Sequence, residues 1–277
     1  MSKANYYPVM TIAGSDSSGG AGIQADIKTI SAIGCYAMSA ITSLTSQNTT
    51  GVEMIMAVTP EMVRSQILYT ASDISPLAVK TGMLCNAVIV KAVADALREL
   101  RKKNPDLPIV VDPVMVSTSG SQLLEHEAID VMKREIFPIA TLVTPNCAEA
   151  LFLAGSPDPK AQISTLRDLG CRNILLKGGD SERKDIKADI LALEGDDEWF
   201  TLVADAVDTK NTHGTGCTLS SAIASYLALG YSLPDAVESG KLFITKALRA
   251  GAGVAIGHGH GPVNHFFQSR HLKKRFR

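Results

Sequence analysis

Short apolar, β-rich runs alternate with amphipathic segments along most of this 277-residue chain. The run at 108–112 is apolar until it ends in Asp112, a pattern typical of a parallel strand that is covered on both faces. Strands that alternate with helices predict a mostly parallel central sheet with helices on both faces. We therefore expect an α/β fold. No linker, low-complexity block or internal repeat divides the chain, so residues 1–277 are expected to form a single domain.

The predicted elements follow one another in a regular order. Strands are expected at 8–13, 36–46, 52–58, 77–81, 108–112, 141–144 and 173–177. Helices are expected at 21–33, after Pro60, at 87–103, near 125–136, from 146, from 160, at 215–229 and at 234–250. The charged stretch 180–210 contains two alternating segments, 188–193 and 199–203, which predict a small hairpin at the edge of the sheet.

Composition excludes several classes of function. An apolar content of 45% is ample for a buried core, and the net charge of −1 gives no reason to expect nucleic acid or a membrane as partner. The five cysteines are odd in number and never spaced C-x-x-C, so we expect neither a disulfide framework nor structural zinc. The N-terminus lacks the pattern of a signal peptide, and no apolar run is long enough to cross a bilayer. We therefore expect a cytoplasmic protein, with the basic stretch 271–277 as a solvated end.

A glycine-rich turn opens the helix predicted at 215–229. Gly214, Thr215 and Gly216 lead directly into Cys217. Such a helix start presents uncommitted backbone N–H groups and the positive end of the helix dipole, which suit a migrating phosphoryl group. An ordinary helix cap of small residues is the alternative. A second glycine-rich turn at 14–22, directly after the first strand, favours the functional interpretation.

The second turn matches neither common nucleotide-binding loop. Its segment 20–25 has the form G-x-G-x-x-A, but the next strand ends in Thr45-Ser46-Gln47, without the acidic residue that would hold a ribose. A Walker P-loop is also excluded, because Gly19 is followed by Gly20 rather than by Lys and Ser or Thr.

Candidate site residues follow several of the predicted strands, where ligands bind in open α/β sheets. They are Gly14, Met83, Asp112, Asn146 and Lys177. Asn146 and Glu149 share one face of a first helical turn, and with Asp112 they supply oxygen ligands that suit Mg²⁺ beside phosphates, usually through water. A helix capping motif without a metal is the alternative for Asn146 and Glu149. Lys177 lies on a glycine turn and suits nucleotide phosphates.

Three further features are open to two interpretations. Asp26 lies one turn beyond the first glycines, where its carboxylate either points back at a ligand or is solvated. Gln47 offers an acceptor and two donors, the set needed to recognise the edge of an aminopyrimidine, but it can equally be a surface amide. His258 and His260 alternate with glycines, and we favour an ordered turn there over a metal site.

Together these segments resemble the ribokinase-like superfamily, and within it the hydroxymethylpyrimidine/phosphomethylpyrimidine kinases of thiamine biosynthesis. The matching stretches are TIAGSDSSGGAGIQADIKT (11–29), SLTSQNTTGV (43–52), KTGML (80–84), VDPVMVSTSG (111–120), TPNCAEA (144–150), KGG (177–179), NTHGTGCTLSSA (211–222) and GHGPVNHF (259–266). They cover nearly the whole chain in order. Most sugar kinases of the superfamily carry Asp at the position of Cys217.

The resemblance implies a three-layer ribokinase-like sandwich that phosphorylates 4-amino-5-hydroxymethyl-2-methylpyrimidine, and then its monophosphate, with ATP and Mg²⁺. The pyrimidine is then expected near Gly14, Asp26, Gln47, Met83 and Val114, with Cys217 under the reacting hydroxymethyl group. ATP and Mg²⁺ are expected near Asp112, Asn146, Glu149 and Lys177, with metal contacts from Asp112 and Glu149 through water. Gly214, Thr215 and Gly216 form the implied anion hole, and the family likeness suggests a homodimer.

Two alternatives and two departures accompany this resemblance. A pyridoxal kinase with the same Gly-Thr-Gly-Cys turn, or a sensor of pyrimidine or nucleotide without turnover, would carry similar motifs. Many relatives have His where this chain has Asp180, and Thr45 replaces a residue that is often apolar. We expect the helix start to lower the pKa of Cys217, and we hypothesise that its thiol orients the hydroxyl and accepts the proton late.

Overall fold

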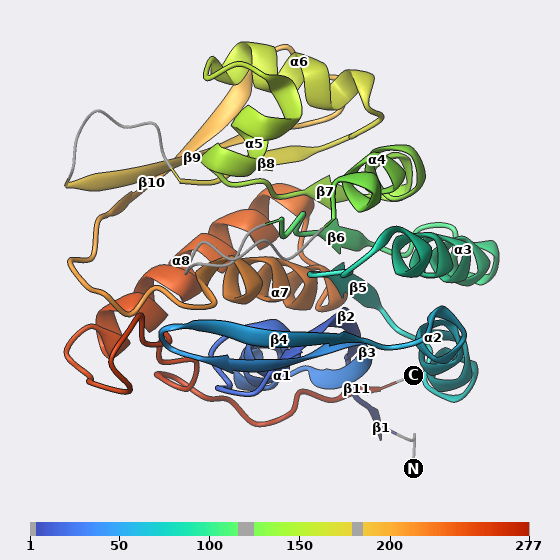
Figure 1. The fold of residues 1–277 in the computed structure, drawn as a ribbon, viewed down its shortest axis with the longest axis horizontal. Helices are drawn as coiled ribbons and strands as arrows, with labels where there is room; N and C mark the ends of the chain where they lie inside the picture. The colour runs from blue at the N-terminus through green and yellow to red at the C-terminus, as the bar shows by residue number, and fades with distance from the viewer. Residues whose placement is uncertain (1–3, 116–124, 179–184, 277) are drawn as a thin grey trace.

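The computed structural model describes residues 4–115, 125–178 and 185–276. Within these residues, nine strands form one sheet in the order β10-β9-β8-β7-β6-β5-β2-β3-β4 (Figure 1). The strands are β2 (Pro8–Asp16), β3 (Tyr36–Asn48), β4 (Gly51–Ala57), β5 (Ala78–Thr81), β6 (Ile109–Val111), β7 (Leu142–Val143), β8 (Ile174–Leu176), β9 (Ile186–Ala192) and β10 (Trp199–Asp205). The six strands from β8 to β3 run parallel, and the outer strands β4, β9 and β10 pair antiparallel.

Helices cover both faces of the sheet. On one face lie α1 (Gly22–Ile33), α7 (Thr215–Ala228) and α8 (Leu233–Gly251). On the other lie α2 (Pro60–Asp73), α3 (Ala87–Lys103), α4 (His126–Glu135), α5 (Cys147–Ala154) and α6 (Pro159–Asp168), with the short 3₁₀ helix η1 (Phe137–Ile139). The predicted α/β architecture, with helices on both faces and β9 and β10 as an edge hairpin, is therefore confirmed (Figure 1).

Two apolar cores result from the alternation of side chains along each strand. In β6, Ile109 and Val111 pack into the core beneath α2 to α6, whereas Val110 packs into the core beneath α1, α7 and α8. All three side chains are fully buried. The continuous apolar run of this strand thus follows from burial on both sides, as its sequence predicts.

The C-terminal segment is solvated, as expected, but it also contains a short strand. The side chains of His271, Leu272 and Lys274 are exposed, whereas Arg275–Phe276 form β11, which pairs antiparallel with β1 (Ala4–Asn5) (Figure 1). The backbone N–H of Lys273 donates to the carbonyl of Gly34 at the end of α1. Backbone pairing of two-residue strands leaves no periodic signal in the sequence, so β11 could not be predicted. No helix in the described part of the chain has the length and apolar character needed to span a membrane.

Candidate active site

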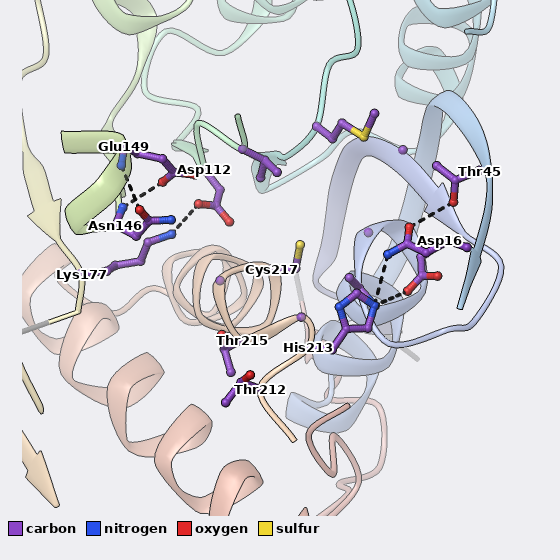
Figure 2. Close-up of a pocket in the computed structure, with 18 of the residues that line it drawn as sticks. Asp16, Thr45, Asp112, Asn146, Glu149, Lys177, Thr212, His213, Thr215 and Cys217 are labelled. Carbon is purple, nitrogen blue, oxygen red and sulfur yellow. Dashed lines mark hydrogen bonds and ion pairs between the residues drawn. The ribbon is translucent and has the colours of Figure 1, made fainter. Parts of the chain in front are cut away.

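A cavity of about 450 Å³ opens at the carboxyl ends of the parallel strands. Every site residue named from the sequence lines it, with the exception of Asp26. Figure 2 shows two groups of side chains in this cavity, with Cys217 between them. Asp112, Asn146, Glu149 and Lys177 form the first group, and Asp16, Thr45 and His213 belong to the second.

The first group is a compact cluster of charges. Lys177 Nζ lies 2.6 Å from Asp112 Oδ1, and both side chains are almost completely buried. Burial alone would lower the pKa of Lys177, but the carboxylates of Asp112 and Glu149 raise it above its ordinary value. Lys177 therefore presents a permanent positive charge to the cavity. The turn that follows Lys177 is anchored to β9, because the N–H of Gly178 donates to Asp189 Oδ1 over 3.0 Å.

Asn146 and Glu149 form the capping box that was the alternative to a metal role. The side chain of Asn146 accepts from the N–H of Glu149 over 2.9 Å, and Glu149 Oε2 accepts from the N–H of Asn146 over 2.8 Å. Burial raises the pKa of Glu149 to about 7, with Asp112 adding to the shift and Lys177 opposing it. The two interpretations are compatible, because the capping box occupies one carboxylate oxygen and leaves Glu149 on the wall of the cavity.

The glycine turn before α7 is imposed by close backbone contacts. Gly214 adopts a φ of 78°, and a Cβ at this position would lie 1.9 Å from the carbonyl oxygen of Gly20. Only glycine satisfies both conditions. Helix α7 then begins without a side-chain cap, so the N–H groups of its first turn carry the partial positive charge of the helix end into the cavity.

The pKa of Cys217 shifts in the direction opposite to the expected one. Burial raises it to about 11, and the ammonium group of Lys80 and the N–H of Gly22 only partly offset that effect. Desolvation of the thiolate therefore outweighs the favourable helix end. At neutral pH the thiol is protonated in this structure.

Asp26 requires a correction, because it lies beneath the cavity and does not line it. Its carboxylate is fully buried and accepts from Lys80 Nζ at 2.9 Å to each oxygen. The hydroxyls of Thr11 and Ser221 also donate to it. Since the carboxylate is committed to these three partners, it supports the floor of the site and is not free to bind a ligand. The sequence shows only that Asp26 follows a glycine turn, not which helix and strand pack against it.

Asp16 and His213 were missed in the sequence and turn out to connect the two glycine turns. Asp16 Oδ2 lies 2.8 Å from His213 Nε2 and also accepts from the N–H groups of Gly20 and Ala21. Burial alone would raise the pKa of Asp16, but hydrogen bonds from His213, Ser18 and Ala21 lower it to about 2. The available signal was an acid shortly after the strand predicted at 8–13 and a histidine directly before the Gly-Thr-Gly turn.

Gln47, the histidine- and glycine-rich turn and Asp180 are the remaining features singled out in the sequence. Gln47 lies on the cavity wall, with its amide between Thr45 and His213. The histidine- and glycine-rich turn packs on the tip of the β3–β4 hairpin, where the N–H of His260 donates to the carbonyl of Thr49 over 2.9 Å. Asp180 and the part of the matching stretches at 116–120 lie outside the described residues.

Comparison with known proteins agrees with this geometry. The sequence profile of the family described as phosphomethylpyrimidine kinase matches residues 16–264. A hydroxymethylpyrimidine/phosphomethylpyrimidine kinase of Rhizobium meliloti is 43% identical over 263 residues, which cover 93% of this chain and 96% of the relative. This chain belongs to the phosphomethylpyrimidine kinase family.

Solved structures show the same fold. The phosphomethylpyrimidine kinase of Clostridium difficile 630 superposes with a TM-score of 0.72 and 41% identity, covering 87% of this chain and 99% of that one. The pyridoxal kinase of Bacillus subtilis, solved as an ADP complex, superposes with a TM-score of 0.82 and 32% identity, covering 94% and 98%. The chain spans 54% of the length of a bifunctional thiamine biosynthesis protein from Geobacter sulfurreducens, so the rest of that protein has no counterpart here.

Proposed function

We propose that this member of the phosphomethylpyrimidine kinase family transfers the γ-phosphoryl group of ATP to 4-amino-5-hydroxymethyl-2-methylpyrimidine, and in a second round to the monophosphate. The observation that carries the proposal is one cavity with two chemically different ends. Gln47 supplies an amide suited to an aminopyrimidine at one end, and Lys177 supplies a cation suited to phosphates at the other. The Rhizobium meliloti relative, with 43% identity, is named as a kinase of hydroxymethylpyrimidine and phosphomethylpyrimidine.

The transfer itself needs mainly position and charge neutralisation. The transition state of phosphoryl transfer is loose in most enzymes, with negative charge on the equatorial oxygens. The first-turn N–H groups of α7 lie between the two ends of the cavity and are placed to stabilise that charge. Lys177, held in place by Asp112, keeps the nucleotide phosphates in reach of the hydroxyl.

Cys217 is proposed to orient the accepting hydroxyl. Because burial raises the pKa of its thiol to about 11, the group carries its own proton at neutral pH. It acts first as a weak hydrogen-bonding partner that directs the hydroxyl oxygen towards phosphorus. A loose transition state leaves the proton on that oxygen until late, so activation of the nucleophile by a strong base is unnecessary. Because the thiol keeps its own proton, it is not the late acceptor expected from the sequence, and the hydroxyl proton passes to an oxygen of the transferred phosphoryl group.

The residues present fit a magnesium ion that shares its coordination between protein and phosphates. Asp112 and Glu149 supply two carboxylates at the phosphate end of the cavity, and Mg²⁺ commonly uses one or two carboxylates with water and phosphate oxygens. Because the pKa of Glu149 is about 7, a nearby dication would lower it, and the carboxyl would release its proton to water and become a metal ligand. When bound, the metal neutralises charge on the transferred phosphoryl group.

The proposal is tested by measuring ADP release with the aminopyrimidine, with its monophosphate and with pyridoxal. We expect turnover with both pyrimidines at a higher kcat/KM than with pyridoxal. Lys177→Met should lower kcat/KM by about a hundredfold or more, as expected for loss of a charged group at the phosphates. Lys246→Met, a matched change at an exposed position on α8, should leave it unchanged. Absence of turnover with either pyrimidine would refute the proposal.

Pyridoxal phosphorylation is the second candidate, because one observation favours it. The pyridoxal kinase structures superpose with TM-scores of 0.82, above the 0.72 of the phosphomethylpyrimidine kinase. Their sequence identity of 32–33% is, however, lower than the 41% of the latter. A preference for pyridoxal in the parallel assay would select this candidate.

We also propose a homodimer in a reducing, cytoplasmic environment. Strand β4 is an edge strand, and its Met54 and Met56 side chains are 65% and 58% exposed, a pattern typical of a surface covered by a second copy. Light scattering should give twice 29.4 kDa, and Met54→Lys with Met56→Lys should give the monomer. None of the five cysteines, all of which lie within the described residues, forms a disulfide, which suits a reducing compartment.

A further inference from the structure

Thr45 lies on the cavity wall beside the amide that we propose contacts the pyrimidine. Its Oγ1 is 2.9 Å from the carbonyl oxygen of Ser15 and 3.1 Å from Oε1 of Gln47. The other end of the Gln47 amide, Nε2, is 3.4 Å from His213 Nε2. Figure 2 shows Thr45 and His213 on the same side of the cavity, with Asp16 beside them. The oxygen and the nitrogen of an amide are alike in shape, so packing does not distinguish its two orientations. The hydrogen-bond partners at the two ends of the amide decide between them.

The Thr45 end is compatible with a donor from the amide. A hydroxyl has one proton, and Thr45 has two acceptors in reach, the Ser15 carbonyl at 2.9 Å and Gln47 Oε1 at 3.1 Å. When the proton goes to the nearer acceptor, Ser15, Thr45 Oγ1 faces the amide as an acceptor. A carbonyl oxygen at 3.1 Å would place two acceptors against each other, whereas an NH₂ group completes a hydrogen bond.

The His213 end leads to the same result independently. His213 Nε2 lies 2.8 Å from Asp16 Oδ2, and a carboxylate can only accept, so this nitrogen carries a proton. The low pKa of Asp16, about 2, keeps that carboxylate ionised at neutral pH. An NH₂ group at 3.4 Å from the protonated nitrogen would place two donors against each other, whereas a carbonyl oxygen can share the proton.

We propose that the Thr45 hydroxyl and the Asp16-bound imidazole of His213 together hold the Gln47 amide in one orientation, with its carbonyl towards His213 and its NH₂ group towards Thr45. This orientation exchanges the Oε1 and Nε2 positions given above and satisfies every donor and acceptor in the chain of contacts. Thr45 is therefore a positioning residue that determines specificity, at a position where this chain departs from the often apolar residue of the resemblance.

The consequence, which rests on the proposed function, concerns the edge of the ring that is recognised. The fixed amide retains one lone pair and one N–H for the ligand. A 4-aminopyrimidine offers an amino donor next to a ring-nitrogen acceptor and pairs with both in one sense only. The corresponding 4-oxo compound offers an acceptor next to an N–H donor, which is the reverse order. Its acceptor would face the amide oxygen of Gln47, and its donor would face the amide NH₂ group.

The test compares kcat/KM for 4-amino-5-hydroxymethyl-2-methylpyrimidine and for its 4-oxo analogue in the wild type, Thr45→Val and Thr45→Ser. Valine has the shape of threonine but no hydroxyl, so the ratio of amino to oxo activity should fall about two- to tenfold, the effect of one hydrogen bond. Serine keeps the hydroxyl and should preserve the ratio. KM for ATP should stay constant in both variants, because Thr45 lies in the group opposite Lys177.

An unchanged ratio in Thr45→Val, or an equal fall in Thr45→Ser, would overturn the inference. A uniform loss with both compounds would also overturn it, because it would indicate a structural role only. Wild-type protein without activity on the amino compound would instead refute the proposed function. If Thr45→Val does not fold, Thr45→Ala provides the same comparison against Thr45→Ser.

Discussion

The buried ion pair between Lys80 and Asp26 makes a quantitative prediction about stability. Both side chains are completely inaccessible to solvent, and Lys80 Nζ lies 2.9 Å from each carboxylate oxygen. In Lys80→Met the Asp26 carboxylate loses its cation and keeps only the hydroxyl donors of Thr11 and Ser221. The variant therefore contains a buried anion without a counter-charge.

Removing one partner of a buried pair typically destabilises a protein by about 3–5 kcal/mol. The two remaining hydroxyl donors place Lys80→Met near the lower limit, at about 3 kcal/mol. For a domain of this size, that corresponds to a fall in Tm of about 6–12 °C. Asp26→Asn should have a similar effect, because it leaves the Lys80 ammonium buried without a carboxylate.

The double variant Asp26→Asn with Lys80→Met decides whether the pair acts through charge. It removes both charges together, so its loss of stability should be smaller than the sum of the single losses by about 2 kcal/mol or more. Urea unfolding at pH 7, followed by circular dichroism, measures all four proteins. Single losses below about 1 kcal/mol, or strictly additive losses, would refute the reasoning.

Three further predictions concern the cavity. If Cys217 orients the hydroxyl and is not a pre-ionised base, kcat of the wild type should be constant from pH 7 to 8.5. Cys217→Ala should lower kcat about ten- to hundredfold and leave its pH dependence unchanged. A tenfold rise in kcat per pH unit that occurs in the wild type but not in Cys217→Ala would contradict this. Gly214→Ala places a Cβ against the Gly20 carbonyl. Circular dichroism should therefore show a lower Tm, and ADP-release assays should show a loss of about a hundredfold in kcat. Gly253→Ala, where a Cβ would meet open space, should change neither Tm nor kcat. The pKa of Glu149 in the folded state is raised to about 7, so deprotonation of this group destabilises the fold increasingly as the pH rises from about 4.5 to 7. Glu149→Gln should therefore raise Tm at pH 8 but not at pH 4. An equal change in Tm at both pH values would exclude burial of the carboxylate as the cause.

The arrangement of layers and the edge at which the site lies could be predicted from the sequence. The apolar run that ends in Asp112 reflects burial on both faces of β6, and that burial is shared by its three residues, Ile109, Val110 and Val111. The Gly-Thr-Gly turn before Cys217 likewise carries its own conformational signal, because a positive φ at Gly214 favours glycine. Such features depend on a few neighbouring residues and are visible in any short window of the chain.

Partnerships between distant segments were decided only by the tertiary structure. Asp16 and His213 are separated by 197 positions, and nothing near either residue indicates that they meet. Asp26 lost its expected ligand role because β5 places Lys80 beneath it. The pKa of Cys217 is raised rather than lowered because packing removes water from its sulfur. Solvation of a side chain depends on every element that surrounds it, whereas sequence periodicity reports only on the element to which the residue belongs.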